Sequence, residues 1–125
     1  MGERAWAKVS VIVVNYRSAG HTVTCLRALR DELDWPAEAL ELICVDNASG
    51  DGGARRIAAE VPQARLIRSA TNIGFAGGCN LGARLATGSI VAFLNSDARP
   101  HRDWVRAAVE VFSEGPDVAA VASKV

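Results

Sequence analysis

The chain has 125 residues, of which 50% are hydrophobic, and its 14 basic and 14 acidic side chains give a formal net charge of zero. This length and apolar content suit one domain with a buried core and leave no room for a second. The balanced charge argues against nucleic acid as a partner, because it lacks the basic field that neutralises many phosphates. The only lysines, Lys8 and Lys124, stand near the chain ends, which excludes an interior P-loop or Schiff-base lysine.

The cysteines and the first residues of the chain are typical of a cytoplasmic protein. Cys25, Cys44 and Cys79 are spaced too widely for a C-x-x-C pair or a zinc motif, so we expect reduced thiols in the core. Residues 1–8 lack the apolar segment of a signal peptide, and the apolar run at 9–14 is too short to span a bilayer. We expect a cytoplasmic location and leave open a peripheral attachment to the cytoplasmic face of a membrane.

Short apolar segments alternate with segments of helical periodicity along the chain. In chain order, the sequence predicts a strand at 9–14, a helix at 22–33, a strand at 42–45, a helix at 53–61, a weaker strand at 64–68, a helix at 76–86, a strand at 90–94, a helix at 103–112 and a weaker strand at 118–121. This alternation is typical of βαβ units. We therefore predict an α/β fold in which an open, mostly parallel sheet carries helices on both faces.

The two ends of the chain lead to separate expectations. Residues 1–8 should form an N-terminal tail in which Trp6 is mobile, and one domain should extend over residues 9–125. The final predicted strand has no following helix to cover it, so we expect the sequence to be the first half of a longer unit. His21 and His101 each precede a predicted helix and are interpreted as solvated loop residues.

Polar residues follow the predicted strands, at the positions where ligands bind in an open parallel sheet. Because the carboxyl ends of parallel strands meet at one edge, we expect these residues to share a site. They are Asn15, Tyr16 and Arg17 after the first strand, Asp46 and Asn47 after the second, residues 69–72 after the third, and Asn95, Ser96 and Asp97 after the strand at 90–94.

Two carboxylates stand out among these residues. Asp46 could accept hydrogen bonds from ribose hydroxyls or a base N–H, or it could be an ordinary turn or helix-capping residue. Asp97 could bind Mg²⁺ or Mn²⁺ that neutralises a diphosphate, with Asn95 leaving the strand on the same side. The alternative for Asp97 is a turn residue before Pro100.

The segment at 72–82 is rich in asparagine and glycine. Its glycines could let the start of a helix approach a ligand, or they could only allow tight helix packing. Their spacing does not match the dinucleotide-binding fingerprint. Arg84, one turn after Asn80, is either a phosphate contact or a solvated helix residue.

Four segments in this order resemble the nucleotide-binding half of family-two glycosyltransferases, which have the Rossmann-like GT-A fold of the nucleotide-diphospho-sugar transferases. The resemblance covers residues 9–125, and the last two segments are similar to those of the rhamnosyltransferase-like subgroup. The segments are VIVVNY (11–16), VDNAS (45–49) with Asp51 and Gly52, NIGFA (72–76) with Asn80 and Gly82, and FLNSD (93–97).

The resemblance implies that the chain binds a nucleoside diphosphate sugar. Asn15 and Tyr16 would lie against the nucleobase and ribose, Asp46 would bind the base, and Asp97 would hold the divalent cation. Asn95 stands where the family's Asp-x-Asp motif has its first acid. The full donor-binding set implied is Asn15, Tyr16, Arg17, Asp46, Asn47, Ser49, Asn72, Gly74, Asn80, Arg84, Asn95, Ser96 and Asp97.

The same resemblance implies an inverting transfer to an acceptor hydroxyl, with a general base that removes the hydroxyl proton. That base and the acceptor-binding half are expected beyond residue 125, so the chain alone should be inactive. The acceptor could be a saccharide, a glycolipid or a cell-wall precursor. A non-enzymatic nucleotide-sugar binding module remains an alternative. A response-regulator receiver is disfavoured, because Asn15, Tyr16 and Arg17 stand where an acidic cluster is needed.

Overall fold

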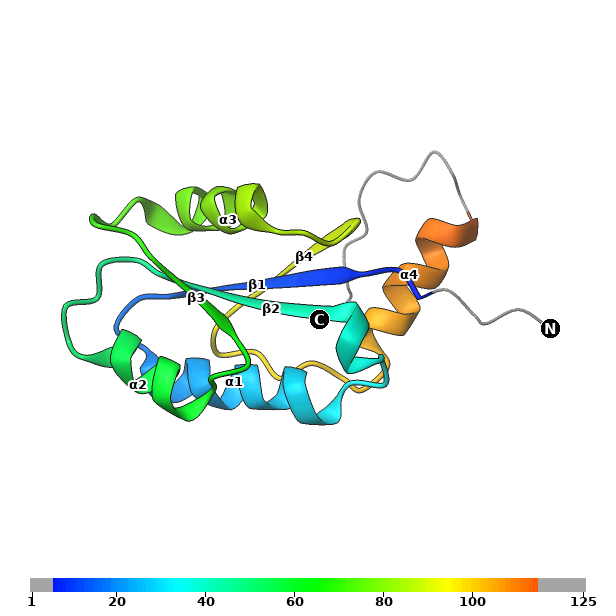
Figure 1. The fold of residues 1–125 in the computed structure, drawn as a ribbon, viewed down its shortest axis with the longest axis horizontal. Helices are drawn as coiled ribbons and strands as arrows, with labels where there is room; N and C mark the ends of the chain where they lie inside the picture. The colour runs from blue at the N-terminus through cyan, green and yellow to red at the C-terminus, as the bar shows by residue number, and fades with distance from the viewer. Residues whose placement is uncertain (1–5, 115–125) are drawn as a thin grey trace.

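A computed structural model describes residues 6–114, and the predicted strand at 118–121 lies outside them. The alternation of strands and helices follows the predicted order (Figure 1). The elements are β1 (Val9–Asn15), α1 (Ala19–Glu32), the short 3-10 helix η1 (Ala37–Ala39), β2 (Leu40–Asp46), α2 (Gly53–Glu60), β3 (Arg65–Arg68), α3 (Gly74–Leu85), β4 (Ile90–Leu94) and α4 (Trp104–Glu114).

The four strands form one parallel sheet in the order β3-β2-β1-β4. The register places Asn15 opposite Asp46, and Asp46 opposite Arg68. Val13, in the middle of the sheet, lies opposite Leu94 of β4. The ends of β1, β2 and β3 are therefore level with one another, and the predicted parallel sheet is confirmed.

Helices cover both faces of the sheet, and each face has its own apolar cluster. Val11 and Val13 of β1 pack with α1, α2 and α4, whereas Ile12 and Val14 pack with α3. Figure 1 shows α3 on one side of the sheet and α1 and α2 on the other. Because successive side chains of a strand point to opposite faces, a strand buried on both faces is apolar without alternation. This explains the unbroken apolar run of β1.

Two glycines bring α3 unusually close to β1. A Cβ atom on Gly82 would lie 2.7 Å from Ile12 Cγ2, and one on Gly78 would lie 3.0 Å from both methyl groups of Val14. Any side chain at Gly82 would push the helix away from the sheet. Tight packing, one of the two explanations for the glycine-rich segment, therefore accounts for Gly78 and Gly82.

A polar cluster joins the amino end of the sheet to the turn before β4. Glu41 of β2 accepts hydrogen bonds from the Ser10 hydroxyl at 2.7 Å and from the Thr87 backbone N–H at 2.9 Å. The Thr87 hydroxyl also donates to Glu41 at 3.1 Å, and Lys8 Nζ donates to Thr87 at 2.6 Å. These bonds fix the segment that leads into β4.

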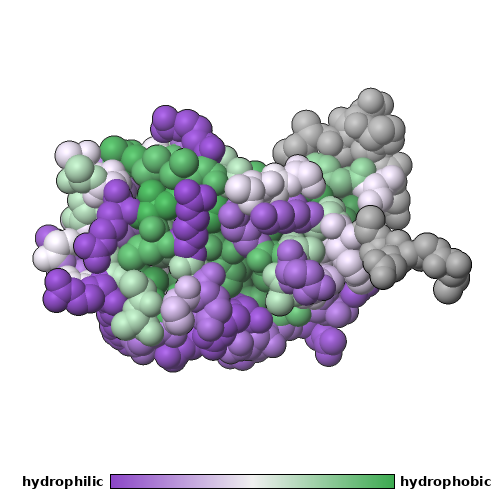
Figure 2. All heavy atoms as spheres, in the orientation of Figure 1, coloured by the Kyte–Doolittle hydropathy of each residue, from purple (hydrophilic) through white to green (hydrophobic). Residues whose placement is uncertain are grey.

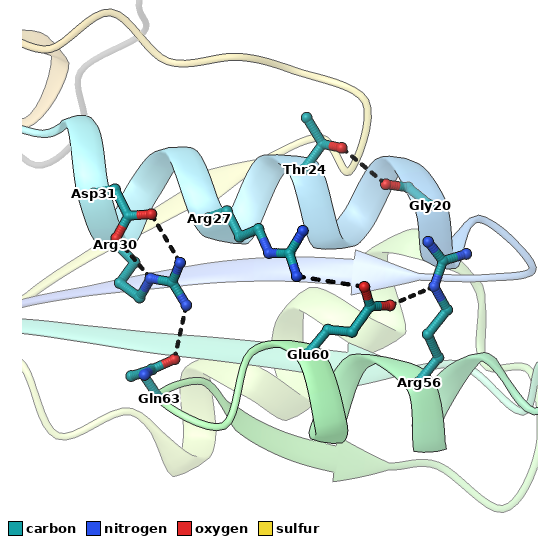
Figure 3. A network of polar contacts seen from close by, with 8 residues as sticks. All are labelled: Gly20, Thr24, Arg27, Arg30, Asp31, Arg56, Glu60 and Gln63. Carbon is teal, nitrogen blue, oxygen red and sulfur yellow. Dashed lines mark hydrogen bonds and ion pairs between the residues drawn. The ribbon is translucent and has the colours of Figure 1, made fainter.

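Hydrophilic side chains cover the outer faces of α1 and α2, whereas apolar side chains gather over α3 and the sheet beneath it (Figure 2). Glu60 of α2 accepts hydrogen bonds from Arg56 at 2.5 Å and from Arg27 of α1 at 3.3 Å (Figure 3). Arg30 donates to Gln63 at 3.1 Å, which links α1 to the segment between α2 and β3. These pairs are exposed, so each should stabilise the fold only slightly.

Three local expectations need correction. The helix expected at 22–33 begins at Ala19, so His21 lies inside α1 and not in a loop before it. Trp6, expected in a mobile tail, packs edge-to-face on Trp35 with ring centroids 4.9 Å apart. Trp35 also donates from Nε1 to the Ala7 carbonyl at 3.2 Å, which holds the end of the expected tail on the domain.

The start of α1 was missed because its first turn lacks the apolar spacing of the rest of the helix. The contact of Trp6 with Trp35 was missed because it joins residues that are distant in the sequence. Among residues 6–114, no helix is both long and apolar enough to cross a membrane.

Candidate functional site

The carboxyl ends of β2 and β3 border a cavity of about 350 Å³. Asp46 and Arg68, which end these two strands opposite each other, both line it. Its floor and rim therefore offer one carboxylate, two guanidinium groups and a hydroxyl. The lining residues are Asp46, Gly50, Gly52, Ala54, Arg55, Arg68 and Ser69.

Asp46 is held rigidly at this edge and is only 5% exposed. Its Oδ1 accepts hydrogen bonds from Asn15 Nδ2 at 2.9 Å and from Ser49 Oγ at 2.6 Å. Its Oδ2 accepts one long bond, 3.3 Å, from the Ser49 backbone N–H. Asp46 thus makes the hydrogen bonds of a turn residue to Ser49. A carboxylate has about four lone-pair sites, so the Asp46 side chain keeps capacity for a further donor.

Asn15 does not reach the site, contrary to the expectation that it lies against a nucleobase. Its side chain is 0% exposed, because β1 is the inner strand between β2 and β4. The amide Nδ2 donates to Asp46, and the amide Oδ1 accepts from Thr22 Oγ1 at 2.6 Å. Asn15 can therefore influence a ligand only through Asp46.

Asn47 and Ser49 are also buried and belong to the frame of the site. Ser49 accepts a hydrogen bond from the Arg17 backbone N–H at 2.9 Å, which ties the loop after β1 to the loop after β2. Asn47 donates from Nδ2 to the Gly74 carbonyl at 2.8 Å and accepts from the Ile73 N–H at 2.9 Å. Neither side chain is free to contact a ligand directly, which corrects their expected role.

Tyr16 and Arg17 do present side chains at the edge of the sheet. Tyr16 is 44% exposed, and the Arg17 guanidinium carbon lies 5.5 Å from the centre of its ring. Arg17 has a φ of 51°, a left-handed conformation that a non-glycine residue adopts only when other contacts compensate. Its bonds to Ser49, from the backbone N–H and from Nε at 3.1 Å, supply that compensation.

Asn72 and Gly74 form the turn that leads into α3. Gly74 has a φ of 78°, and its N–H donates to Asn72 Oδ1 at 2.9 Å. Both residues are exposed, as is Asn80 farther along α3. They remain available to a ligand as expected.

Arg84 lies at the wrong end of α3 for the expected site. At 1.5 Å per residue, it stands about 15 Å from Gly74 along the helix axis. The neighbouring Leu85 carbonyl accepts a hydrogen bond from Arg65, the first residue of β3, at 3.0 Å. Arg84 is thus an exposed residue at the amino edge of the sheet. The alternative of a solvated helix residue is correct.

Asn95, Ser96 and Asp97 follow the end of β4 in a turn, in which the Ala98 N–H donates to the Asn95 carbonyl at 3.0 Å. Asn95 and Asp97 are exposed. Cys25 of α1 lies beneath them and donates from Sγ to the Asn95 carbonyl at 3.6 Å. Burial, and secondly the negative charge of Asp97, raise the pKa of Cys25 to about 11.

Asp97 is the residue predicted to bind a divalent cation, and the described part of the chain offers such a cation few further protein ligands. Within residues 6–114 there is no group of three or more His, Cys, Asp or Glu residues that could hold a metal ion. A cation at Asp97 would therefore need most of its ligands from a bound substrate and from water, which is common for Mg²⁺ at phosphate-binding sites.

Two charged cavity residues, Arg55 and Arg68, were not among the residues predicted from the sequence. Site candidates were sought only among residues after each predicted strand, whereas Arg68 is the last residue of β3. Extending the search to the last residue of every strand would have found Arg68. Arg55 lies in the first turn of α2, and no sequence signal distinguishes it from its neighbour Arg56.

Comparisons with known proteins agree with this fold and identify the family. The model of the family described as glycosyl transferase family 2 matches residues 10–125. Glycosyltransferase AglE of Haloferax volcanii is 31% identical over 108 residues, which cover 84% of this chain and 35% of AglE. Succinoglycan biosynthesis protein ExoO of Rhizobium meliloti is 33% identical over 103 residues, which cover 82% of this chain and 29% of ExoO.

Solved structures show the same similarity. Mannosyltransferase PcManGT from Pyrobaculum calidifontis, in complex with GDP-Man and Mn²⁺, superposes with a TM-score of 0.75 at 34% identity over 86% of this chain and 32% of that chain. S. aureus TarS 1-349 in complex with UDP also gives a TM-score of 0.75, at 25% identity and the same coverage. The chain spans about a third of the length of these relatives.

Proposed function

We propose, from the premise that this chain belongs to glycosyl transferase family 2, that its carboxyl-edge cavity binds the nucleoside diphosphate of a sugar donor. The observation that carries the proposal is the pairing of Asp46 and Arg68 across one cavity at the ends of adjacent strands. Residues 9–125 would then be the nucleotide-sugar-binding half of a glycosyltransferase domain. The family is established, whereas the rhamnosyltransferase-like subgroup remains a prediction.

The chemistry of the cavity suits the polar edge of a nucleobase. Asp46 Oδ2 can accept from a base N–H, while Arg55, Arg68 and Ser69 can donate to base carbonyls or ribose oxygens. The exposed ring of Tyr16 stands at the same edge and can supply an aromatic surface. PcManGT and TarS, which have the same fold, were solved with GDP-Man and with UDP, respectively, and this supports a nucleotide ligand.

Asp97 would hold a divalent cation next to the diphosphate. β2 and β4 both neighbour β1, so their ends lie about 10 Å apart, which leaves the diphosphate room to extend from the cavity towards Asp97. A bound Mg²⁺ or Mn²⁺ would neutralise charge on the departing nucleoside diphosphate. The Mn²⁺ in the PcManGT complex supports this assignment.

The rest of the activity follows from the family and rests on sequence outside this chain. We propose an inverting transfer whose general base and acceptor-binding part lie beyond Val125, with a saccharide, glycolipid or cell-wall precursor as acceptor. The relatives that act in succinoglycan and amylovoran biosynthesis favour a polysaccharide. A cytoplasmic site of action, with peripheral contact to the membrane, is part of the same proposal. A binding module without transferase activity would use the same cavity, so transfer assays with the longer protein are needed to separate the two.

Calorimetry of the chain with UDP, dTDP and GDP in the presence of Mn²⁺ tests the proposal. One nucleotide should bind, and Asp46→Ala and Arg68→Ala should each weaken its binding by about tenfold or more. Asp97→Ala should remove the dependence of binding on Mn²⁺. Arg84→Ala is the matched control, because it removes an exposed arginine at the opposite edge of the sheet and should leave the affinity unchanged. Failure of all three nucleotides to bind would contradict the proposal.

A further inference from the structure

A hydrogen-bonded chain of four buried side chains runs from α1 to the candidate nucleotide site. Thr22 Oγ1 donates to Asn15 Oδ1 at 2.6 Å, and Asn15 Nδ2 donates to Asp46 Oδ1 at 2.9 Å. Ser49 Oγ donates to the same Asp46 oxygen at 2.6 Å. All four residues are at most 5% exposed.

Each member of the chain has its direction of donation fixed by its partners. The Asp46 carboxylate can only accept, so the NH₂ end of the Asn15 amide must face it. The carbonyl end of that amide then points the other way and needs a donor. Thr22 is the residue that supplies one, because its hydroxyl lies 2.6 Å from Asn15 Oδ1. A buried acceptor without such a donor would be costly.

A neighbouring threonine shows that this contact is not the ordinary behaviour of threonine in a helix. Thr24, on the exposed side of α1, donates to the carbonyl of its own helix at Gly20, at 3.1 Å (Figure 3). That i−4 bond is the usual partner of a helical hydroxyl. The Thr22 hydroxyl instead donates to Asn15 of β1. The next residue, Val23, packs into the apolar cluster on the same side of the sheet.

We propose that Thr22 is a positioning residue for donor binding, acting through Asn15 on the Asp46 carboxylate. The proposal rests on the proposed function, in which Asp46 contacts the nucleotide. The Thr22 hydroxyl holds the Asn15 amide in one orientation, and the amide in turn holds the Asp46 carboxylate at the cavity that Asp46 lines. Thr22 itself does not line the cavity.

The test compares three substitutions at Thr22 by nucleotide affinity and by stability. Thr22→Val keeps the volume of the side chain but removes the donor, and it should weaken binding of the preferred nucleotide by about tenfold. Thr22→Ser keeps the hydroxyl and should bind within about twofold of the wild-type chain. Thr22→Ala removes the same hydroxyl without placing a methyl group against the Asn15 amide, so it provides the measurement if Thr22→Val does not fold.

Val23→Ala is the matched control, since it destabilises the same helix by loss of apolar packing and touches none of the four polar groups. It should lower the unfolding midpoint in urea while leaving the affinity unchanged. Equal affinity losses in Val23→Ala and Thr22→Val would reduce Thr22 to a purely structural role and overturn the proposal. A Thr22→Val chain that binds as well as the wild type would also overturn it. If the wild-type chain binds no nucleotide at all, the proposed function fails instead.

Discussion

Asn47, directly after β2, is joined to Gly74, the first residue of α3, by a hydrogen bond of 2.8 Å from Asn47 Nδ2 to the Gly74 carbonyl. A second bond, 2.9 Å long, runs from the Ile73 N–H to Asn47 Oδ1. One buried side chain thus holds both a donor and an acceptor of the turn before α3. The segment between β3 and α3, which contributes Ser69 to the cavity, is therefore fixed at its far end by β2.

Asn47→Ala should destabilise the chain by about 1–3 kcal/mol, because it removes both bonds of this brace. Urea unfolding followed by circular dichroism measures the loss. Asn72→Ala is the control, since it removes one exposed bond, to the Gly74 N–H, and should cost less than about 1 kcal/mol. If the two variants were equally stable, the two buried hydrogen bonds of Asn47 would contribute no more to stability than the one exposed bond of Asn72.

Gly82→Ala should destabilise the chain by about 1–3 kcal/mol, although an alanine inside a helix normally stabilises it. The new Cβ would lie 2.7 Å from Ile12 Cγ2, so α3 must move away from β1. Gly20→Ala is the matched control, because the nearest atom to its new Cβ is Arg56 Nη1 at 3.8 Å, and it should be neutral or stabilising.

The urea midpoints of the two glycine variants show whether each substitution raises or lowers the stability of the chain. Ile12→Ala opens space at the contact, so the double variant Gly82→Ala, Ile12→Ala should lose less stability than the two single losses together. If the stability losses of the two single variants simply add in the double variant, position 82 and Ile12 are not in steric conflict.

Glu41 should make the stability of the chain depend on pH in the acid range. Burial by itself raises the pKa of Glu41, but the hydrogen bonds from Thr87 and Ser10 and the charge of Lys8 outweigh it, so the pKa lies below its usual value. A carboxylate whose pKa is lower in the folded state stabilises the fold above its unfolded pKa of about 4.3. That contribution is lost as the pH falls through the folded value.

Glu41→Gln should therefore be less stable than the wild type at pH 7, and the difference should shrink as the pH is lowered below about 4. Urea unfolding of both chains at several pH values measures it. Glu38→Gln, which removes an exposed carboxylate of η1, is the matched control for the loss of one negative charge. A difference in unfolding free energy between Glu41→Gln and the wild type that stays constant from pH 7 to pH 3 would contradict the lowered pKa of Glu41.

Much of the fold could be predicted because β1 and β2 are buried on both faces, and such strands produce apolar runs that few other structures share. The strand-end rule also located Asp46 correctly. It could not tell which polar side chains turn inward, and Asn15, Asn47 and Ser49 all do. That choice depends on partners such as Thr22, which are distant in sequence and become visible only in the folded chain.

Distance along a helix explains the other errors. Arg84 follows Asn80 by one turn, yet that turn carries it farther down α3, to the amino edge of the sheet. Arg68 was overlooked for a different reason, since it is the last residue of β3 and only residues after the predicted strands were considered.

The three cysteines should be almost unreactive until the chain unfolds. Burial is the main reason that the pKa of Cys25 rises to about 11 and that of Cys44 to about 12, and burial also raises the pKa of Cys79. With a pKa of about 11, roughly one Cys25 thiol in a thousand is ionised at pH 8, and the thiolate is the reactive form. Brief treatment with iodoacetamide at pH 8, followed by mass spectrometry, should therefore leave the native chain largely unmodified. In about 8 M urea, which unfolds the chain, all three cysteines should react. Rapid modification of Cys25 in the native chain would show that the turn at Asn95, which covers it, opens readily.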